Sequence, residues 1–445
     1  MPIDDSNYGG GDILVTEFNI ISSSGKQLKD ITPRAWNSIT YVESMGLIAS
    51  DPQFITGEAV IIDRVNIFNE MKLVGDEIIE VSFETPQKDS ISFVGRVYNV
   101  DVTMIAPKER MIKLKFCSAE KLVADQVKVN KVYRNVPYHR IAQDLFVPFK
   151  DVSGKRIFAE PTKNIGSVII NQKSPLEAIN MISAVSIPEK YQGSNYVFFE
   201  KSNGLFVFSS IEGLVDPVEN SPVMTYSADE LPGDKKDIIS LRKILSYKVL
   251  NLPNISMDIN QGVYGSTLIS NDLMKRKVTV SKFNYLNSYN DYKHVNYNFT
   301  GISGNMRISS ISNNPRYSER SSSFVKIIPR HFGSFDVDGL PLSNYSDDRQ
   351  GTELQRRSQM GQINSVRLEI LVNGDSQRKV GEVVKIIIPA IEEQNNEQGG
   401  RIDGLLSGKY LVSKVKHTIL SKAAGYKTTL QLVKDSFETP LSEKR

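Results

Sequence analysis

The residue types that most often carry catalysis or bind metals are sparse in this sequence of 445 residues. No two histidines have a metal-binding spacing such as His-x-x-x-His, so we expect structural or surface roles for all of them. The single cysteine, Cys117, excludes an internal disulfide framework and a cysteine-based zinc site. Trp36 has no second tryptophan with which to stack a sugar, so a half-buried structural role is expected. The four histidines are His139, His294, His331 and His417.

Three short motifs resemble ligand-binding loops but lack essential parts. The run Asp336–Gly339 places two acids as in a calcium loop, without the third spaced acid or the closing glutamate. Gly9–Gly11 precedes no lysine–serine pair and no nucleotide-binding helix. Glu392 and Glu393 are adjacent on a polar loop, where carboxylates usually stay solvated. The sequence therefore predicts no catalytic residue, no metal site and no cofactor.

The net charge does not indicate a particular type of binding partner either. The chain has 54 basic and 51 acidic residues, a net charge of +3, so no sequence-specific nucleic-acid binding is expected. The basic runs Lys275–Lys277 and Arg356–Arg357 could contact an acidic partner or DNA, but solvated faces are the commoner outcome. The N-terminus lacks the features of a signal peptide, and no stretch reaches membrane-spanning length. We expect a soluble globular protein.

Short strands dominate the region that would position any site near the N-terminus. Residues 79–84 alternate apolar and polar side chains, as in a strand with one buried face. The runs 94–104 and 111–117 complete an antiparallel set of the sandwich or barrel type. After about residue 130 the period becomes helical, and Ser174–Glu177 has the form of a capping box with proline at the first helical position. Asn203–Gly204 predicts a hairpin turn between two aromatic strands.

The second half of the chain returns to β-structure. Residues 262–360 have weak periodicity and are expected to form long connections with a few strands, ending in a helix from about 347 to 360. Strands follow at 366–370 and 383–388. The polar stretch 391–400 is expected to be a mobile loop.

Three landmarks of the early β region recur in the late one. Val74–Val81 resembles Val380–Ile387: a turn glycine, an acid and then a strand. Gly95–Arg96 before a strand resembles Gly408–Lys409 before another. The apolar residues Ile112, Leu114 and Phe116 correspond to Thr428, Leu430 and Leu432. Because the landmarks keep their order, the sequence predicts a duplicated structural unit.

The same stretches resemble the central baseplate hub of contractile-tailed, T-even-like bacteriophages, a family related to the hub part of type VI secretion spike proteins. Gly75–Ser82 resembles the segment before that family's hub-loop strand, Gly408–His417 its closing hairpin and Tyr426–Val433 its final strand. The resemblance covers nearly the whole chain, with a poor match at 286–350. It implies a mainly β fold with an α+β insertion and two tail-tube-like antiparallel β-barrels in one chain.

The resemblance also implies a function in assembly rather than catalysis. Family members form a homotrimer whose six similar barrels adapt a hexameric tail tube to a trimeric cell-puncturing spike. The implied partners are tube and tube-initiator proteins, the spike and, beyond these, the tape measure and surrounding baseplate proteins, in a virion assembled in the host cytoplasm. The implied interface residues are Gly95, Arg96, Tyr98, Gly408, Lys409, Tyr410 and Phe437.

Two alternatives stay open at this point. A tail-associated glycan or peptidoglycan hydrolase would present a cleft with two acids at glycosidase separation. A secretion-system spike trunk would need a C-terminal β-helix or effector domain, which the end at Arg445 disfavours. The expected layout is a flexible N-terminus at 1–12, a first barrel at 13–125, a middle domain at 126–236 and 263–360, a second barrel at 237–262 and 361–435, and a C-terminal tail at 436–445, which the spike could bind.

Overall fold

The computed structural model describes most of the chain. The described residues are 13–29, 31, 35–85, 90–216, 223–228, 242–272, 276–299, 325–330, 345–390, 402–421 and 425–439. Several predictions concern residues outside these ranges and are not taken further: the N-terminus 1–12 with Gly9–Gly11, Lys275, His331, the motif Asp336–Gly339, and the loop 391–400 with Glu392 and Glu393.

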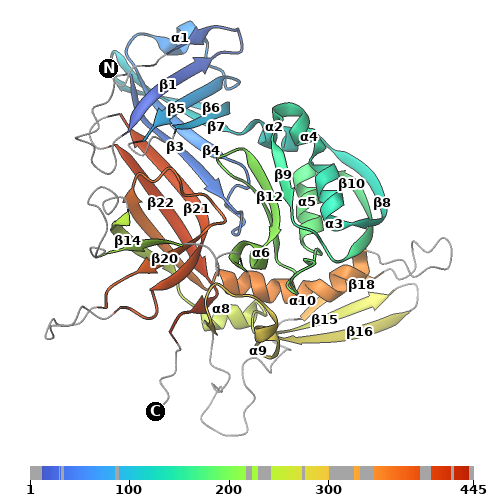
Figure 1. The fold of residues 1–445 in the computed structure, drawn as a ribbon. Coiled ribbons are helices and arrows are strands. Elements are labelled where there is room, and N and C mark those ends of the chain that lie inside the picture. Colours follow the sequence, from blue (N-terminus) through green and yellow to red (C-terminus); the bar gives the residue numbers. More distant parts are fainter. Residues whose placement is uncertain are drawn as a thin grey trace, which may run out of the picture.

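The first β unit lies at the top of Figure 1 and is built from alternating apolar and polar residues. In β5 every second side chain, from Ile79 to Phe83, is buried, which is the pattern predicted from the sequence. The sheet order is β2-β1-β5-β6-β7-β4-β3. Its elements are β1 (Leu14–Ile21), β2 (Gln27–Leu28), β3 (Trp36–Ser44), β4 (Thr56–Asp63), α1 (Ile67–Met71), β5 (Ile78–Glu84), β6 (Ser90–Ala106) and β7 (Glu109–Cys117).

The second β unit is assembled from segments far apart in the sequence. Its sheet order is β13-β20-β21-β22-β19-β14. β13 pairs with β20, although the layout expected from the sequence places its residues in the middle domain. The strands are β13 (Met224–Ser227), β14 (Ile244–Asn251), β19 (Val366–Asn373), β20 (Val383–Ile387), β21 (Gly408–Leu420) and β22 (Tyr426–Lys434), and the short helix α8 (Ile255–Asn260) follows β14.

The two units match strand by strand, which confirms the predicted duplication. In chain order and in sheet order, β1, β3, β4, β5, β6 and β7 correspond to β13, β14, β19, β20, β21 and β22. One difference is direction, because β1 runs antiparallel to β5 whereas β13 runs parallel to β20.

Irregularities of the backbone recur at matching places as well. The β3–β4 register shifts between Trp36 and Ser38, and the β14–β19 register shifts between Ile244 and Ser246. The β6–β7 register shifts after Val97, and the β21–β22 register shifts after Val412. Bulges are placed by specific local pairing, so their recurrence fixes the alignment to the residue.

This alignment corrects two of the three sequence landmarks. Val97 and Val412 each donate a backbone hydrogen bond of 2.8 Å, to the carbonyls of Glu77 and Glu382. The structure therefore pairs Glu77 with Glu382. Counting from the turn glycines pairs Asp76 with Glu382 instead, so the first landmark is aligned one residue away from its structural position. The second is displaced by two, since Gly95 matches Tyr410 and not Gly408. The turn glycines of the two units lie at different distances from the matching strand residues, so aligning the glycines shifts the alignment of the strands.

Both units belong to one continuous sheet of 13 strands, because β3 also pairs with β21. Within the described residues no strand pairing closes either unit into a barrel; a single parallel bridge, Ser227–Lys243, joins the end of β13 to the start of β14. Closure of the two units into barrels is thus not detected in the described residues and stays a prediction, while the two units share one sheet. The core of the first unit includes Ile419 and Tyr426 of the second, so the cores merge at the junction.

An α+β domain packs beside the two units (Figure 1). The predicted capping box is present, with the Ser174 hydroxyl 3.1 Å from the Glu177 amide and the Glu177 carboxylate 2.8 Å from the Ser174 amide. The predicted hairpin is β11–β12, with Gly204 at a φ of 75°. Its elements are α2 (Ala119–Gln126), β8 (Val129–Pro137), α3 (Tyr138–Leu145), α4 (Val147–Ser153), β9 (Arg156–Ala159), β10 (Ile165–Lys173), α5 (Pro175–Ser183), β11 (Tyr196–Glu200), β12 (Leu205–Ser210) and α6 (Ile211–Val215).

A small three-stranded sheet completes the described structure and rests on the long helix α10 through Leu268 and Leu354. This is more regular than the long connections expected for residues 262–360. The remaining elements are β15 (Gly265–Asp272), β16 (Lys277–Asn284), α9 (Tyr285–Ser288), the 3₁₀ helix η2 (Tyr289–Asp291), β17 (Asn298–Phe299), β18 (Val325–Arg330), α10 (Tyr345–Ile363) and β23 (Ser436–Phe437), which pairs with β17.

Candidate assembly interface

The junction between the two β units shows how one unit joins another. The outer half of β21 pairs antiparallel with β3, from Lys414 opposite Ser44 to Leu420 opposite Ser38. This pairing satisfies the backbone groups of both strands, which an open sheet would leave exposed. The junction is thus an edge-to-edge contact within one chain.

Aromatic and ionisable side chains fill the junction. Tyr41 and His417 are directly opposite and stack with ring centroids 4.4 Å apart, and His417 Nδ1 is 2.8 Å from the Tyr426 hydroxyl. Burial lowers the pKa of His417 to about 3, so the ring is neutral. Burial also raises the pKa of Glu43, whose Oε1 lies 4.0 Å from His417 Nε2, to about 7.

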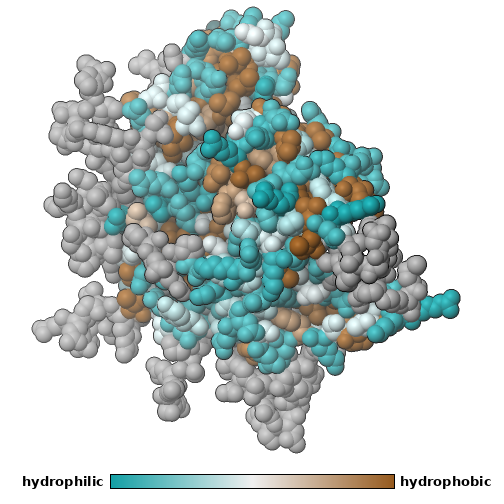
Figure 2. Space-filling view, turned by 45° about the vertical axis from the view of Figure 1, so that its right-hand side comes forward, coloured by the Kyte–Doolittle hydropathy of each residue, from teal (hydrophilic) through white to brown (hydrophobic). Residues whose placement is uncertain are grey.

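The strand of the first unit that corresponds to β21 has no such partner. β6 pairs with β5 through Ser90–Arg96 and with β7 through Arg96–Ala106. Across the described residues, no strand lies along the other edge of 99–105, the stretch that matches 414–420. Figure 2 shows hydrophobic side chains gathered over the first unit. Those exposed on β6 are Val94, Tyr98, Val102, Met104 and Ile105.

The strand that corresponds to β3 is free in the same way. β14 pairs with β19 on one side, and in the part of the chain that the structure describes its other edge meets only the bridge at Lys243. Residues 245–248 are all exposed, including Leu245 at 45% and Tyr247 at 42%. The described part of the chain therefore presents two free edges, and each is the counterpart of one side of the filled junction.

The seven interface residues implied by the family resemblance are not brought together. Tyr98 is 45% exposed beside the free edge of β6, and Gly95 is buried against the Phe116 ring. Tyr410 and Phe437 are 0% and 4% exposed, with the Lys434 ammonium over both rings, so these two side chains pack inside the chain. Arg96 and Lys409 are partly buried and Gly408 is buried. Their role at an interface stays a prediction.

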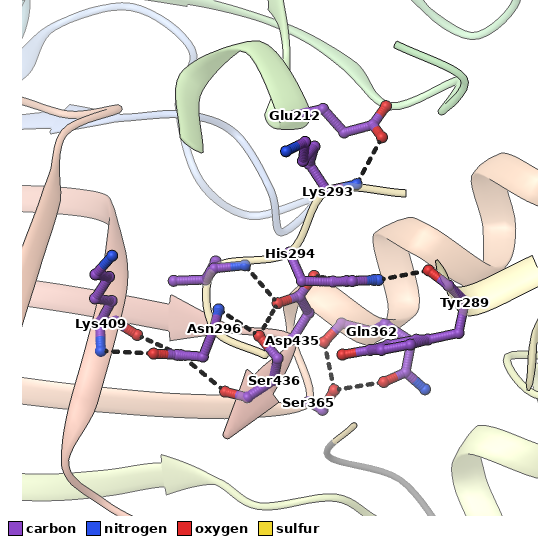
Figure 3. Close-up of polar contacts among 11 residues, drawn as sticks. Glu212, Tyr289, Lys293, His294, Asn296, Gln362, Ser365, Lys409, Asp435 and Ser436 are labelled. Carbon is purple, nitrogen blue, oxygen red and sulfur yellow. Dashed lines mark hydrogen bonds and ion pairs between the residues drawn. The ribbon is translucent and has the colours of Figure 1, made fainter. Parts of the chain in front are cut away.

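A buried polar network explains why the Gly408–Tyr410 segment is held within the chain (Figure 3). Asn296 receives the Lys409 amide at 2.9 Å and donates to the carbonyls of Lys409 and Ser436, each at 2.9 Å. His294 lies 2.8 Å from Asp435. Burial alone would lower the pKa of His294, but the adjacent Asp435 carboxylate outweighs it and raises this pKa. The network ties the segment before β17 to β21 and β23.

The residues considered for chemistry have structural surroundings. Trp36 is 3% exposed, edge-on to Phe18, so it is more deeply buried than expected. His139 is hydrogen-bonded to Thr162. Arg356 donates to the carbonyls of Ser183, Ser194 and Tyr196, which joins α10 to the α+β domain rather than leaving a solvated face. Burial raises the pKa of the Cys117 thiol to about 11.

Neither a metal-binding cluster nor a membrane-crossing helix occurs in the described residues. No group of three or more histidine, cysteine, aspartate or glutamate side chains there is arranged to hold a metal ion. None of the helices there is long and apolar enough to cross a membrane.

One groove of about 320 Å³ contains two acids, Glu160 and Glu189, as the hydrolase alternative requires. The Glu160 carboxylate accepts hydrogen bonds from the Ser210 amide at 2.6 Å and from the Ser209 hydroxyl at 2.8 Å. These bonds hold the turn from β12 into α6. The carboxylate therefore has a structural task, and the groove provides no argument for hydrolysis.

The fold is shared with two solved tail proteins, one of them from a prophage. The tail protein from Neisseria meningitidis MC58 has a TM-score of 0.53 and 12% identity, over 96% of this chain and 97% of that one. The 43 kDa tail protein of prophage MuSo2 from Shewanella oneidensis has a TM-score of 0.51 and 11% identity, over 95% of this chain and 99% of that one. The Escherichia coli type VI secretion protein c3393 reaches 0.43 at 9% identity, over 95% and 76%, which is too low to define a common fold.

No family model matches the chain, and no curated protein matches it in sequence. At 11–12% identity the two tail proteins establish the fold alone. The chain thus shares the fold of these two tail proteins, mainly β with an α+β insertion, which agrees with the resemblance seen in the sequence.

The free edge of β14 was missed by sequence reasoning. Its strand could have been found from the run Leu245–Leu250, but nothing in that run marks an unpaired edge. Only the match between β14 and β3 shows that a partner strand is lacking among the described residues.

Proposed function

We propose that this protein is a structural baseplate hub of a contractile phage tail. Three copies form a ring of pseudo-sixfold symmetry that joins a hexameric tail tube to a trimeric cell-puncturing spike. The role is in assembly rather than catalysis, and the location is the virion after assembly in the host cytoplasm. Contacts with the tape measure and surrounding baseplate proteins belong to the same proposal.

The observation that carries the proposal is the presence of two matching β units in one chain. Three such chains provide six similar units, the number that a hexameric ring presents, while the chain as a whole keeps threefold symmetry for a trimeric partner. The phage tail protein fold is consistent with this role. The free edges of β6 and β14 provide each chain with one surface of each kind needed to close a ring.

The proposal is tested by the mass and shape of the purified full chain. Light scattering after size-exclusion chromatography should give three times the chain mass of 49.9 kDa, and electron microscopy should show a six-lobed ring. A chain that stays monomeric at high concentration, or assembles with another symmetry, would contradict it.

A further inference from the structure

The junction inside the chain is a template for a contact between chains. It uses the outer half of β21 and the free side of β3. Their counterparts, residues 99–105 of β6 and the strand β14, are separated in the sheet by β7, β4, β3, β21, β22 and β19. In the described residues these two edges do not pair with each other, and neighbouring copies can supply a partner strand to each.

We propose that β6 of one copy pairs antiparallel with β14 of the next, with Thr103 opposite Lys248. This proposal rests on the trimer of the preceding section and adds the strands and the register to it. The same pairing places Met104 opposite Tyr247 and Val102 opposite Val249.

The register follows from the matching bulges. Asn99 and Lys414 are the first residues after one pair of bulges, opposite Lys115 and Gln431. Ser38 and Ser246 are the first residues after the other pair, opposite Val60 and Leu371. Within the chain, Thr418 lies opposite Thr40. In the other unit, Thr103 is the counterpart of Thr418 and Lys248 is the counterpart of Thr40. The equivalent pair between chains is therefore Thr103 and Lys248. The β14–β19 register shifts again after Val249, so β14 matches β3 residue by residue only as far as Val249.

The side chains of both edges suit a contact that forms after folding. Met104 is 72% exposed and Tyr247 is 42% exposed, so pairing them removes apolar surface from water. The buried pair Tyr41 and His417 of the internal junction is replaced by Val249 and Val102, which need no hydrogen-bond partner. A charge placed here would be buried on pairing.

A contact of this kind can be repeated from copy to copy around the proposed trimer. Each chain contributes a β6 edge on one side and a β14 edge on the other, which is a head-to-tail interface. In a trimer, three contacts between chains would alternate with the three junctions that lie within the chains. All six contacts around the ring are then of one type.

Cysteine cross-linking of the full chain tests the register. The variant Thr103→Cys/Lys248→Cys should, under mild oxidation, convert most of the protein into covalent trimers on a non-reducing gel, reversibly with reductant. The matched control, Thr103→Cys/Leu245→Cys, is three residues out of register and should give no more cross-linking than the single variants. A disulfide within one chain would leave the mass unchanged, and Cys117 is buried and remains in place.

The outcomes separate this inference from the proposed function. A trimer that fails to cross-link, or that cross-links equally in the control, would overturn the register alone. A chain that stays monomeric would overturn both. Hydrogen exchange of the unsubstituted protein provides an independent test. Backbone amides in 99–105 and 246–249 should exchange more slowly in the trimer than in dilute monomer. Equal exchange in the two states would also overturn the register.

Discussion

The two β units share strand order and bulges but fill matching core positions with side chains of opposite size. In the first unit the large Phe116 lies opposite Gly57 and against Gly95. In the second, the matching positions are the smaller Leu432 with Leu368 and Tyr410. Close packing of a core constrains the summed volume of the neighbouring side chains more strictly than the identity of any one of them. This exchange of size explains why the units align well in space and poorly in sequence.

The units differ also in what covers their long hairpins. The β21–β22 hairpin is covered by β3 of the same chain, with Tyr41, His417 and Glu43 buried in the contact. The β6–β7 hairpin has an uncovered edge with exposed apolar residues. A permanent contact can contain buried ionisable groups because it forms with the fold, whereas a contact between chains must leave both edges soluble beforehand.

The largest expected effect tests the exchange of size in the first unit. A Cβ added at Gly95 would lie 2.7 Å from Phe116 Cδ2, so Gly95→Val should lower the free energy of unfolding by about 3 kcal/mol. Valine is chosen over the tyrosine of the second unit because it adds no hydroxyl. The measurement is urea denaturation.

The control is a double-mutant cycle with Phe116→Leu, which alone costs about 1–2 kcal/mol through lost packing. The double variant should be more stable than the sum of the single effects by at least about 1 kcal/mol. Strict additivity would refute the idea that the two positions exchange volume.

An effect of at most the same size is expected at the internal junction. Because burial raises the pKa of Glu43 from 4.5 to about 7, the unfolded chain ionises first and stability falls as the pH rises from 4.5 to 7. Glu43→Gln should remove this loss and stabilise the protein above pH 7 by up to about 3 kcal/mol.

The opposite dependence should remain in that variant. His417 has a pKa lowered to about 3, so stability falls as the pH drops from 6.5 towards 3. Denaturation midpoints measured from pH 4 to 8 check both signs. If Glu43→Gln kept the wild-type decline between pH 5 and 7, Glu43 would not be the group responsible.

The smallest effect concerns the proposed contact between chains. Ile105→Asp places a charge on the free edge of β6 and should weaken trimer formation at least about tenfold, which is about 1.4 kcal/mol, because the charge is buried on pairing. Sedimentation analysis measures the change.

The matched control is Ile169→Asp on β10. The two isoleucines are exposed to the same extent, 54% and 53%, and both lie on strands. Ile169→Asp should leave the association constant unchanged. Equal weakening by the two variants would point to a general effect of charge instead of a contact at β6.

Much of the fold could be predicted from local patterns. The alternation at Ile79–Phe83, the capping box at Ser174 and the hairpin turn at Gly204 depend on residues near one another in the chain, and the structure contains all three. The interface residues cannot be judged from local patterns in the same way. Tyr410 and Phe437 both lie under the Lys434 ammonium, a contact that residue spacing does not predict, and their role at an interface stays a prediction.

By itself, the sequence determined many of the strands, the capping of α5 and the duplication, since these follow from spacing and residue type. Tertiary structure alone decided that β13 joins the second unit, that β3 covers β21, and that the described residues leave edges of β6 and β14 free. The physical reason is that a strand's pairing partner is set by sheet register over long separations. Alternating residues predict that a strand exists, but not which of its edges remains open.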